Sequence, residues 1–225
     1  MNQRIWIPLL LLFVGSMFFI SSCGDKEQVR EDIIRVALEI EALKPAYRQR
    51  IILQHPRKDE KVSYTMDCSG FVFAVYNTAL TGIFEKQKNK IAGANGVRII
   101  YNRLKKLQKI YRKKIPQVAD IVFFDNTYDR NTNGVVDDEL VHVGIVLAVD
   151  EMGTITFIHS STSAGVTRGY ANLSYPHDEK LNGEPLNSSL RRQRASDPSD
   201  TRYYAGALIH AFGAVFDIPE EGEDF

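Results

Sequence analysis

The fold of this chain is predicted most directly from the stretch Leu140-Val141-His142-Val143-Gly144-Ile145-Val146-Leu147. β-Branched and aliphatic residues dominate this stretch, which is typical of a buried β-strand. Similar short runs occupy 121–124, 154–159 and 203–212, and all of them follow Pro116. The second half of the chain is therefore predicted to form a sheet.

Before Pro116 the apolar residues follow helical spacing instead. We expect helices from Gln28 to Leu43 and from Asp67 to Leu80. A third helix is predicted from an apolar face that carries Val97, Ile100, Tyr101, Leu104, Leu107 and Tyr111. The charged segment 54–61 and the polar segment 172–200 are expected to be loops. Helices followed by strands predict an α+β fold, with the N-terminal helices packed on a central antiparallel β-sheet.

The length and composition match one globular domain with an export segment. The chain has 225 residues, of which 44% are apolar and 25% charged. We expect four parts: a lipoprotein signal peptide at 1–22, an anchor and N-terminal helix at 23–50, a catalytic domain at 51–216 with insertions near 125–140 and 172–200, and an acidic tail at 217–225.

The first residues predict export and lipid anchoring. An uncharged apolar run follows Arg4 and ends at Ile20-Ser21-Ser22-Cys23, which resembles a bacterial lipobox with Cys23 as the lipidated residue. Acyl chains on Cys23 are expected to hold the protein on a membrane of the cell envelope, facing the periplasm or the cell surface. The alternative is an uncleaved helix that contains a cysteine by chance.

Lipidation of Cys23 would leave Cys68 as the only thiol, without a disulfide partner. Cys68 is either a small buried residue or a nucleophile. Asp67 is a good N-cap, so Cys68 is predicted in the first turn of a helix. The helix end contributes about 0.3 to 1 kcal/mol, whereas lowering the thiol pKa to about 4 to 6 needs roughly 3 to 6 kcal/mol. An activated Cys68 therefore requires a histidine.

Two of the five histidines lie on adjacent predicted strands. His142 lies within the strongest strand, where Gly144 is expected to leave room for the approaching helix end. His159 closes the next strand, so an antiparallel hairpin could bring it to His142 and orient that ring. The alternative is that both are hydrogen-bonded sheet histidines without a chemical role.

Four segments together resemble the NlpC family of papain-like cell-wall peptidases. They are Asp67-Cys68-Ser69-Gly70-Phe71-Val72, Ala119-Asp120-Ile121-Val122-Phe123-Phe124, His142-Val143-Gly144-Ile145 and Phe157-Ile158-His159. The resemblance covers roughly Tyr64 to Ser160, and Ala119 stands where the family usually has glycine.

The resemblance implies a papain-like fold and a peptidoglycan endopeptidase. Cys68 would be the nucleophile that forms an acyl-enzyme, His142 the base, and His159 the residue that orients the base. Tyr64 and Ser69 are expected to contact the substrate, a bacterial wall stem peptide. The same dyad also serves an amidase or transferase acting on another amide or ester. A calcium-dependent, non-catalytic binding lipoprotein is the alternative from a different class.

The segment before His142 resembles the calcium loop of an EF-hand. The predicted ligands of a structural Ca2+ are Asp129, Asn131, Asn133, Val135, Asp137 and Glu139, with glycine at position 6 of the loop. The last acid comes one residue early, and no flanking helices are predicted. An Asn/Gly-rich turn with solvated acids is the alternative, and we expect no cofactor for catalysis.

The charges balance, with 28 basic and 28 acidic residues, which gives no reason to expect nucleic acid as a partner. The segment 86–114 is basic and contains no acid. It could face anionic wall polymer or lipid headgroups, or simply be the solvated face of a helix. We expect a monomer whose partners are wall-derived peptides and, through the anchor, the membrane.

Overall fold

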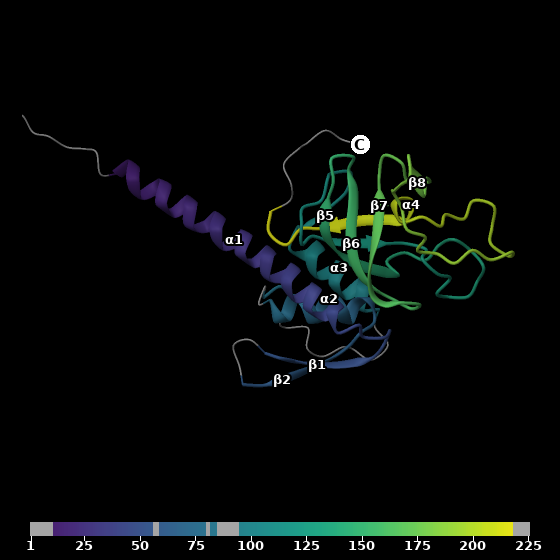
Figure 1. The fold of residues 1–225 in the computed structure, drawn as a ribbon, viewed down its shortest axis with the longest axis horizontal. Helices are drawn as coiled ribbons and strands as arrows, with labels where there is room; N and C mark the ends of the chain where they lie inside the picture. The colour runs from purple at the N-terminus through teal and green to yellow at the C-terminus, as the bar shows by residue number, and fades with distance from the viewer. Residues whose placement is uncertain (1–10, 56–58, 80–81, 85–94, 218–225) are drawn as a thin grey trace, which may run out of the picture.

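The computed structural model describes residues 11–55, 59–79, 82–84 and 95–217, with side chains from residue 24 onward. A six-stranded antiparallel sheet forms its centre, in the order β3-β10-β4-β5-β6-β7 (Figure 1). Its strands are β3 (Ile110–Tyr111), β4 (Ile121–Phe124), β5 (His142–Val149), β6 (Thr154–Ser161), β7 (Gly165–Asn172) and β10 (Ile209–Gly213). The predicted α+β fold, with helices on a central antiparallel sheet, is confirmed.

Among the described residues, four helices accompany the sheet: α1 (Leu11–Ala42), α2 (Cys68–Thr78), α3 (Gly96–Lys106) and α4 (Ala205–Leu208). Helix α1 starts well before the predicted Gln28, and its N-terminal part extends away from the sheet in Figure 1. Within the described part of the chain, no helix has the length and apolar character needed to cross a membrane. The side chain of Cys23 and residues 1–10 lie outside the described residues, so the lipobox remains a prediction.

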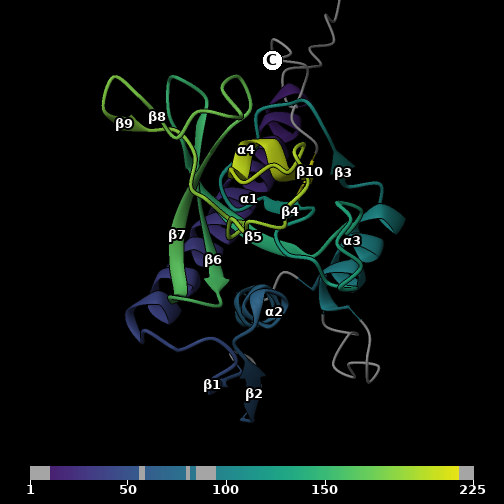
Figure 2. The same ribbon diagram turned by 90° about the vertical axis from the view of Figure 1, so that its right-hand side faces the viewer.

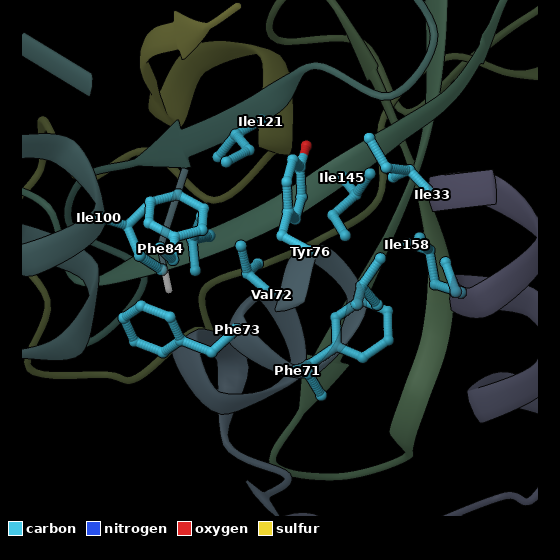
Figure 3. Close-up of a cluster of buried hydrophobic side chains, with 14 of the residues drawn as sticks. Ile33, Phe71, Val72, Phe73, Tyr76, Phe84, Ile100, Ile121, Ile145 and Ile158 are labelled. Atoms are coloured by element: carbon cyan, nitrogen blue, oxygen red, sulfur yellow. The ribbon is translucent and has the colours of Figure 1, made fainter. Parts of the chain in front are cut away.

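The main core lies between one face of the sheet and helices α1, α2 and α3. Figure 3 shows Phe71, Val72 and Tyr76 of α2 packed against Ile145 of β5 and Ile158 of β6. All five side chains are fully buried. This apolar contact explains why α2 is held against the centre of the sheet, since burying each such side chain stabilises the fold by about 1.5 to 3 kcal/mol.

A second core covers the opposite face of the sheet. Its largest members are Phe124, Phe157 and Phe212, and α4 contributes Ala205 and Leu208. Successive side chains of β5 and β6 point to opposite faces of the sheet, so Ile145 and Ile158 lie in the main core and Val146 and Phe157 in the second.

Several elements differ from the predictions. Tyr111 belongs to β3 and not to the third helix, which ends at Lys106 and is followed by a left-handed residue, Gln108, with φ 56°. Around the predicted loop 54–61, β1 (Arg50–Gln54) and β2 (Lys61–Thr65) form a hairpin. These strands alternate polar and partly buried residues in only five positions each, a weak signal.

Strand β7 was not predicted, because two glycines and an arginine interrupt its sequence. It pairs with β6 over eight residue pairs. Gly169 is needed there, since a Cβ would lie 2.6 Å from the Phe157 ring. Strand β7 therefore forms because of its contacts with β6, although its own residues have low β-propensity.

The segment 172–200 is held by side-chain amides and contains the short strands β8 (Lys180–Leu181) and β9 (Glu184–Pro185). Asn187 Oδ1 accepts from the N–H groups of Asn172 and Gly206, and its Nδ2 donates to the carbonyls of Tyr175 and Asp178. Asn187 is buried and its hydrogen-bonding capacity is used. The predicted loop is thus a hydrogen-bonded extension of the sheet edge.

Candidate active site

Cys68 is a half-buried cysteine that forms no disulfide and stands at the first position of α2. Asp67 caps the helix, as predicted, because its Oδ1 accepts from the Gly70 N–H at 2.7 Å. Gly70 is required at this point, since a Cβ would lie 1.8 Å from the Thr65 carbonyl oxygen at the end of β2. The strand end and the helix start therefore hold the thiol in a defined position.

The two histidines meet as the hairpin prediction requires. His142 Nε2 and His159 Nδ1 are 2.7 Å apart, and the rings are nearly perpendicular, at 88°. The register pairs Ile145 with Ile158, which places His142 diagonally across from His159. The Phe124 ring packs on His142 and the Phe157 ring on His159, both from the second core.

Burial determines the protonation of this pair. It lowers the pKa of His159 from 6.5 to about 4. Burial also lowers the pKa of His142 well below its ordinary value, and the neighbouring His159 ring adds to this. Only one proton can occupy the N···N contact. A neutral His159 can accept from Nε2–H of His142, and Nδ1 of His142 then carries no proton.

Gly144 serves a different purpose from the one predicted. A Cβ at Gly144 would lie 3.0 Å from the Ile158 carbonyl oxygen, 3.1 Å from Phe157 Cδ2 and 3.4 Å from His159 Cβ. The space beside His142 is therefore taken by side chains of β6, and not by the end of α2.

A buried hydrogen bond ties the nucleophile's turn to the histidine strand. Ser160, next to His159, donates through Oγ to the Met66 carbonyl at 2.7 Å. Met66 lies two residues before Cys68. Figure 2 shows α2 lying beneath the ends of β5 and β6. The turn before Cys68 is thus tied to the end of β6, next to His159.

The chain that leads into His142 is held in a left-handed conformation at Leu140, with φ 54°. The Leu140 N–H donates to Asp125 Oδ1 at 2.7 Å, and its carbonyl accepts from Asn95 Nδ2 at 2.9 Å. Asp125 Oδ2 in turn lies 2.8 Å from His210 Nδ1. No sequence pattern pointed to these residues, because their contacts join segments far apart in the chain.

The Ala119-Asp120 part of the motif is structural. Ala119 has φ 69°, a region that favours glycine and explains the usual family residue. Asp120 is fully buried and accepts from the Tyr111 hydroxyl at 2.5 Å and the Gln117 N–H at 3.1 Å. Burial raises the pKa of Asp120, and the Tyr111 hydrogen bond opposes this.

The two predicted substrate contacts are placed elsewhere. The Ser69 hydroxyl is 4% exposed and donates to Asp67 Oδ1 at 2.7 Å, so it completes the helix cap. Burial raises the pKa of Tyr64, and the neighbouring Asn77, nine residues after Cys68, lowers it. The tyrosines that interact electrostatically with Cys68 are instead Tyr47 and Tyr128.

In the predicted calcium loop, amide and backbone N–H groups donate hydrogen bonds to the carboxylates of Asp129 and Asp137. Asp137 Oδ1 lies 3.3 Å from Asn131 Nδ2, and Asp137 Oδ2 lies 3.1 Å from Asn133 Nδ2. Asp129 Oδ2 accepts from the Gly134 N–H, whereas its Oδ1 is buried without a hydrogen-bond partner. Val135 and Glu139 are exposed. In the described ranges no three His, Cys, Asp or Glu side chains form a metal-binding group, because this loop depends on asparagines and carbonyls.

Comparison with known protein families gives a match that covers part of the chain. No curated protein and no solved structure matches the chain. The CHAP domain matches residues 58–161, a range that contains Cys68, His142 and His159. The matched segment is thus similar to the CHAP domain, which occurs in cell-wall hydrolases and amidases and is related to the papain-like NlpC peptidases.

Proposed function

We propose that the chain is a cysteine hydrolase that cleaves a peptide bond in bacterial wall stem peptides through an acyl-enzyme on Cys68. The CHAP domain implies a hydrolase acting on peptidoglycan. The observation that carries the finer proposal is the 2.7 Å contact between His142 Nε2 and His159 Nδ1. When Nε2–H of His142 donates in this contact, Nδ1 of His142 carries no proton and can serve as the base.

The proposed reaction has two stages. His142 Nδ1 takes the proton of Cys68, and the sulfur attacks the scissile carbonyl carbon. The C–N bond then breaks, and the leaving amine receives the proton from His142. In the second stage His142 takes a proton from water, which attacks the thioester and releases the acid and the thiol.

The surroundings of Cys68 support each stage. Its backbone N–H lies in the first turn of α2, where N–H groups lack carbonyl partners within the helix and can stabilise an oxyanion. The hydrogen bond to a neutral His159 holds the His142 ring while its charge changes. His159 acts through His142 and is a positioning residue.

Defined muropeptides incubated with the purified protein and with Cys68→Ala test the proposal. Release of a fragment by the wild type alone supports it, and mass spectrometry of the product identifies the bond. Cleavage of an amide outside the stem peptide would favour the amidase or transferase alternative. No fragment from any muropeptide contradicts the wall-hydrolase function.

The alkylation rate of Cys68 between pH 5 and 8 separates an enzyme from a binding lipoprotein. A fast and nearly pH-independent rate indicates a thiolate paired with a protonated His142. Burial lowers the pKa of His142, and the negative charge of a neighbouring thiolate raises it again. A rate that rises tenfold per pH unit indicates an unactivated thiol and favours a non-catalytic binding protein.

We also propose that the loop 129–139 binds a structural Ca2+. The buried, unpartnered Asp129 Oδ1 supports this, because buried carboxylate oxygens normally have a partner. Asn131, Asn133 and Asp137 would be further ligands, and the ion would order the chain that leads into His142. Calorimetry with Ca2+ tests it, with Asp129→Asn beside the control Asp150→Asn. No millimolar or tighter binding, together with unchanged thermal stability after chelation, contradicts the proposal.

Lipid anchoring in the cell envelope remains a proposal based on Cys23. Labelling of cells with a palmitate analogue is expected to mark the wild-type protein and not Cys23→Ala. Equal labelling of both proteins contradicts the anchor.

A further inference from the structure

A pocket of about 390 Å³ lies at the β7 edge of the sheet, and its walls are outside the segment 58–161 that matches the CHAP domain. They come from β7, from the β8–β9 hairpin and from the segments 187–193 and 203–204. Figures 1 and 2 both show β8 near the end of β7 that lies away from α2. Tyr170, in the wall, follows Thr167 by three residues, and Thr167 pairs with His159. The pocket therefore begins about 10 Å along β7 from the residue opposite His159.

Hydrogen bonds join the walls of this pocket. Tyr170 and Ser188 share two of them, because the Ser188 N–H donates to the Tyr170 carbonyl and the Ser188 Oγ accepts from the Tyr170 N–H, each at 2.9 Å. The Tyr203 hydroxyl donates to Asp197 Oδ2 at 3.3 Å. Asp197 also forms an ion pair with Arg191 at 3.2 Å, with side chains that are 6% and 7% exposed. The pocket is therefore formed before a ligand binds, which lowers the entropic cost of binding.

The lining combines aromatic rings with available hydrogen-bonding groups. Tyr170, Tyr203 and Tyr204 line the pocket, and all three are half-buried. Within the described ranges the hydroxyls of Tyr170 and Tyr204 form no hydrogen bond, and neither does the side-chain amide of Gln193, which is exposed. A tyrosine offers an apolar ring and a polar hydroxyl together. Tyrosine beside serine and an amide is a lining that gives both contact area and adaptable hydrogen bonds.

The charge of the lining narrows the class of ligand. Glu179 and Lys180 are the acid and the base among the lining residues, so their charges cancel. A phosphate or a carboxylate would meet no excess of cationic donors there. A purely apolar ligand would leave hydroxyl and amide groups without partners. A pyranose ring matches the lining, because its C–H faces are apolar and its edge carries hydroxyls. The volume lies within the roughly 300–1,000 Å³ of small-molecule pockets.

We propose that this pocket binds sugar rings of a polysaccharide, with Tyr170 and Tyr204 stacked on the rings and Gln193 hydrogen-bonded to their hydroxyls. The site is separate from the catalytic centre and would hold the wall polymer while Cys68 cleaves a stem peptide attached to it. This holding role rests on the proposed hydrolase function, whereas the saccharide class rests on the pocket alone. Wall glycan is the polysaccharide that the proposed function supplies.

Calorimetry of the full-length Cys68→Ala protein tests the pocket with two peptide-free probes, a tetramer of N-acetylglucosamine and a tetramer of glucose. The first tetramer is expected to bind. Tyr170→Ala and Tyr204→Ala should each weaken its binding about tenfold, and Tyr204→Phe and Gln193→Ala about threefold. Tyr175→Ala is the matched control and should bind like its parent, because Tyr175 is 41% exposed in the same insertion and does not line the pocket.

Each outcome of this titration decides the proposal. Binding of the glucose tetramer alone supports the saccharide site and identifies a polysaccharide other than wall glycan as its ligand. Binding of neither tetramer, or equal affinity in every pocket variant, overturns the proposal. Gln193→Ala changes an exposed side chain, so it decides the question even if a tyrosine variant does not fold.

The alkylation rate of Cys68 in the wild type, with and without saturating tetramer, shows where the saccharide binds. Because the pocket lies away from the thiol, the rate should stay the same. A slower rate with the tetramer would mean that the saccharide covers Cys68, and it would overturn the separate site.

Stem peptides that are free or attached to a glycan tetramer test the holding role. Tyr204→Ala should raise KM about tenfold for the attached peptide alone, with kcat unchanged. An equal change for both substrates overturns the holding role. Cleavage of neither substrate, with saccharide binding intact, contradicts the hydrolase function and still supports the saccharide site. Cleavage of both without any saccharide binding supports the hydrolase and overturns the site.

Discussion

The buried histidine pair predicts a specific loss of stability in acid. His159 is 6% exposed, and burial lowers its pKa to about 4. Because the unfolded chain binds this proton near pH 6.5 and the native chain does not, stability falls as the pH drops from 6.5 to 4. The shift of about 2.5 pKa units corresponds to about 3 kcal/mol, a large share of the stability of one domain.

His159→Asn removes this titration. Urea unfolding at pH values from 7 to 4 should show that the variant loses about 3 kcal/mol less than the wild type over this range. His159 also lowers the pKa of His142, so its removal acts in the same direction there. Carboxylates that titrate over the same range are present in both proteins, and their contribution cancels in the difference.

His177→Asn is the matched control, because it removes an exposed imidazole. The free energy of unfolding of His177→Asn should depend on pH in the same way as that of the wild type. Parallel losses in wild type and His159→Asn would refute the reasoning, since they would mean that His159 is protonated equally in the folded and unfolded chain. Alkylation of Cys68 in a second variant, His159→Leu, should in addition be slower near neutral pH, because leucine offers no acceptor that could orient the His142 ring.

Three further changes are expected to disturb the site by different routes. Gly70→Ala places a methyl group against the Thr65 carbonyl oxygen and should lower the free energy of unfolding in urea by more than about 3 kcal/mol. A near-neutral result would show that β2 can move away from α2. Gly144→Ala should cost about 1 to 3 kcal/mol and slow alkylation of Cys68, whereas unchanged values in both assays would contradict the tight packing of β5 on β6. Asp125→Ala leaves the Leu140 N–H without its acceptor and should cost about 1 to 3 kcal/mol, with a lower kcat at unchanged KM; a change in KM alone would show that the contact does not position His142.

The helical start at Cys68 was predictable because its causes are local. Asp67 can cap a helix through its own side chain, and the apolar spacing that follows marks the buried face. The strand around His142 was predictable for the same kind of reason, from its run of β-branched residues. The contact between His142 and His159 was predictable because the two residues lie on consecutive antiparallel strands, which have few possible registers.

Other parts of the site depend on contacts that no local pattern encodes. The position of Tyr64 beside Asn77 follows from the β1–β2 hairpin, whose strands are too short and too polar to be predicted. A close approach to Gly144 was predicted, but the element that approaches it is β6 and not the end of α2. Ser160 and Met66 are separated by most of the domain in sequence, so only the folded chain brings the Ser160 hydroxyl to the Met66 carbonyl.

The sequence by itself determined the fold class, the helix-capped thiol and the two histidine strands, because caps and periodicity act within a few residues. Only the tertiary structure decided which ring nitrogens of His142 and His159 face each other, how Leu140 is held in a left-handed conformation, and what fills the space beside Gly144. These features depend on hydrogen bonds and burial between segments that are distant in the chain, and the free energy of such contacts has no counterpart in a local pattern.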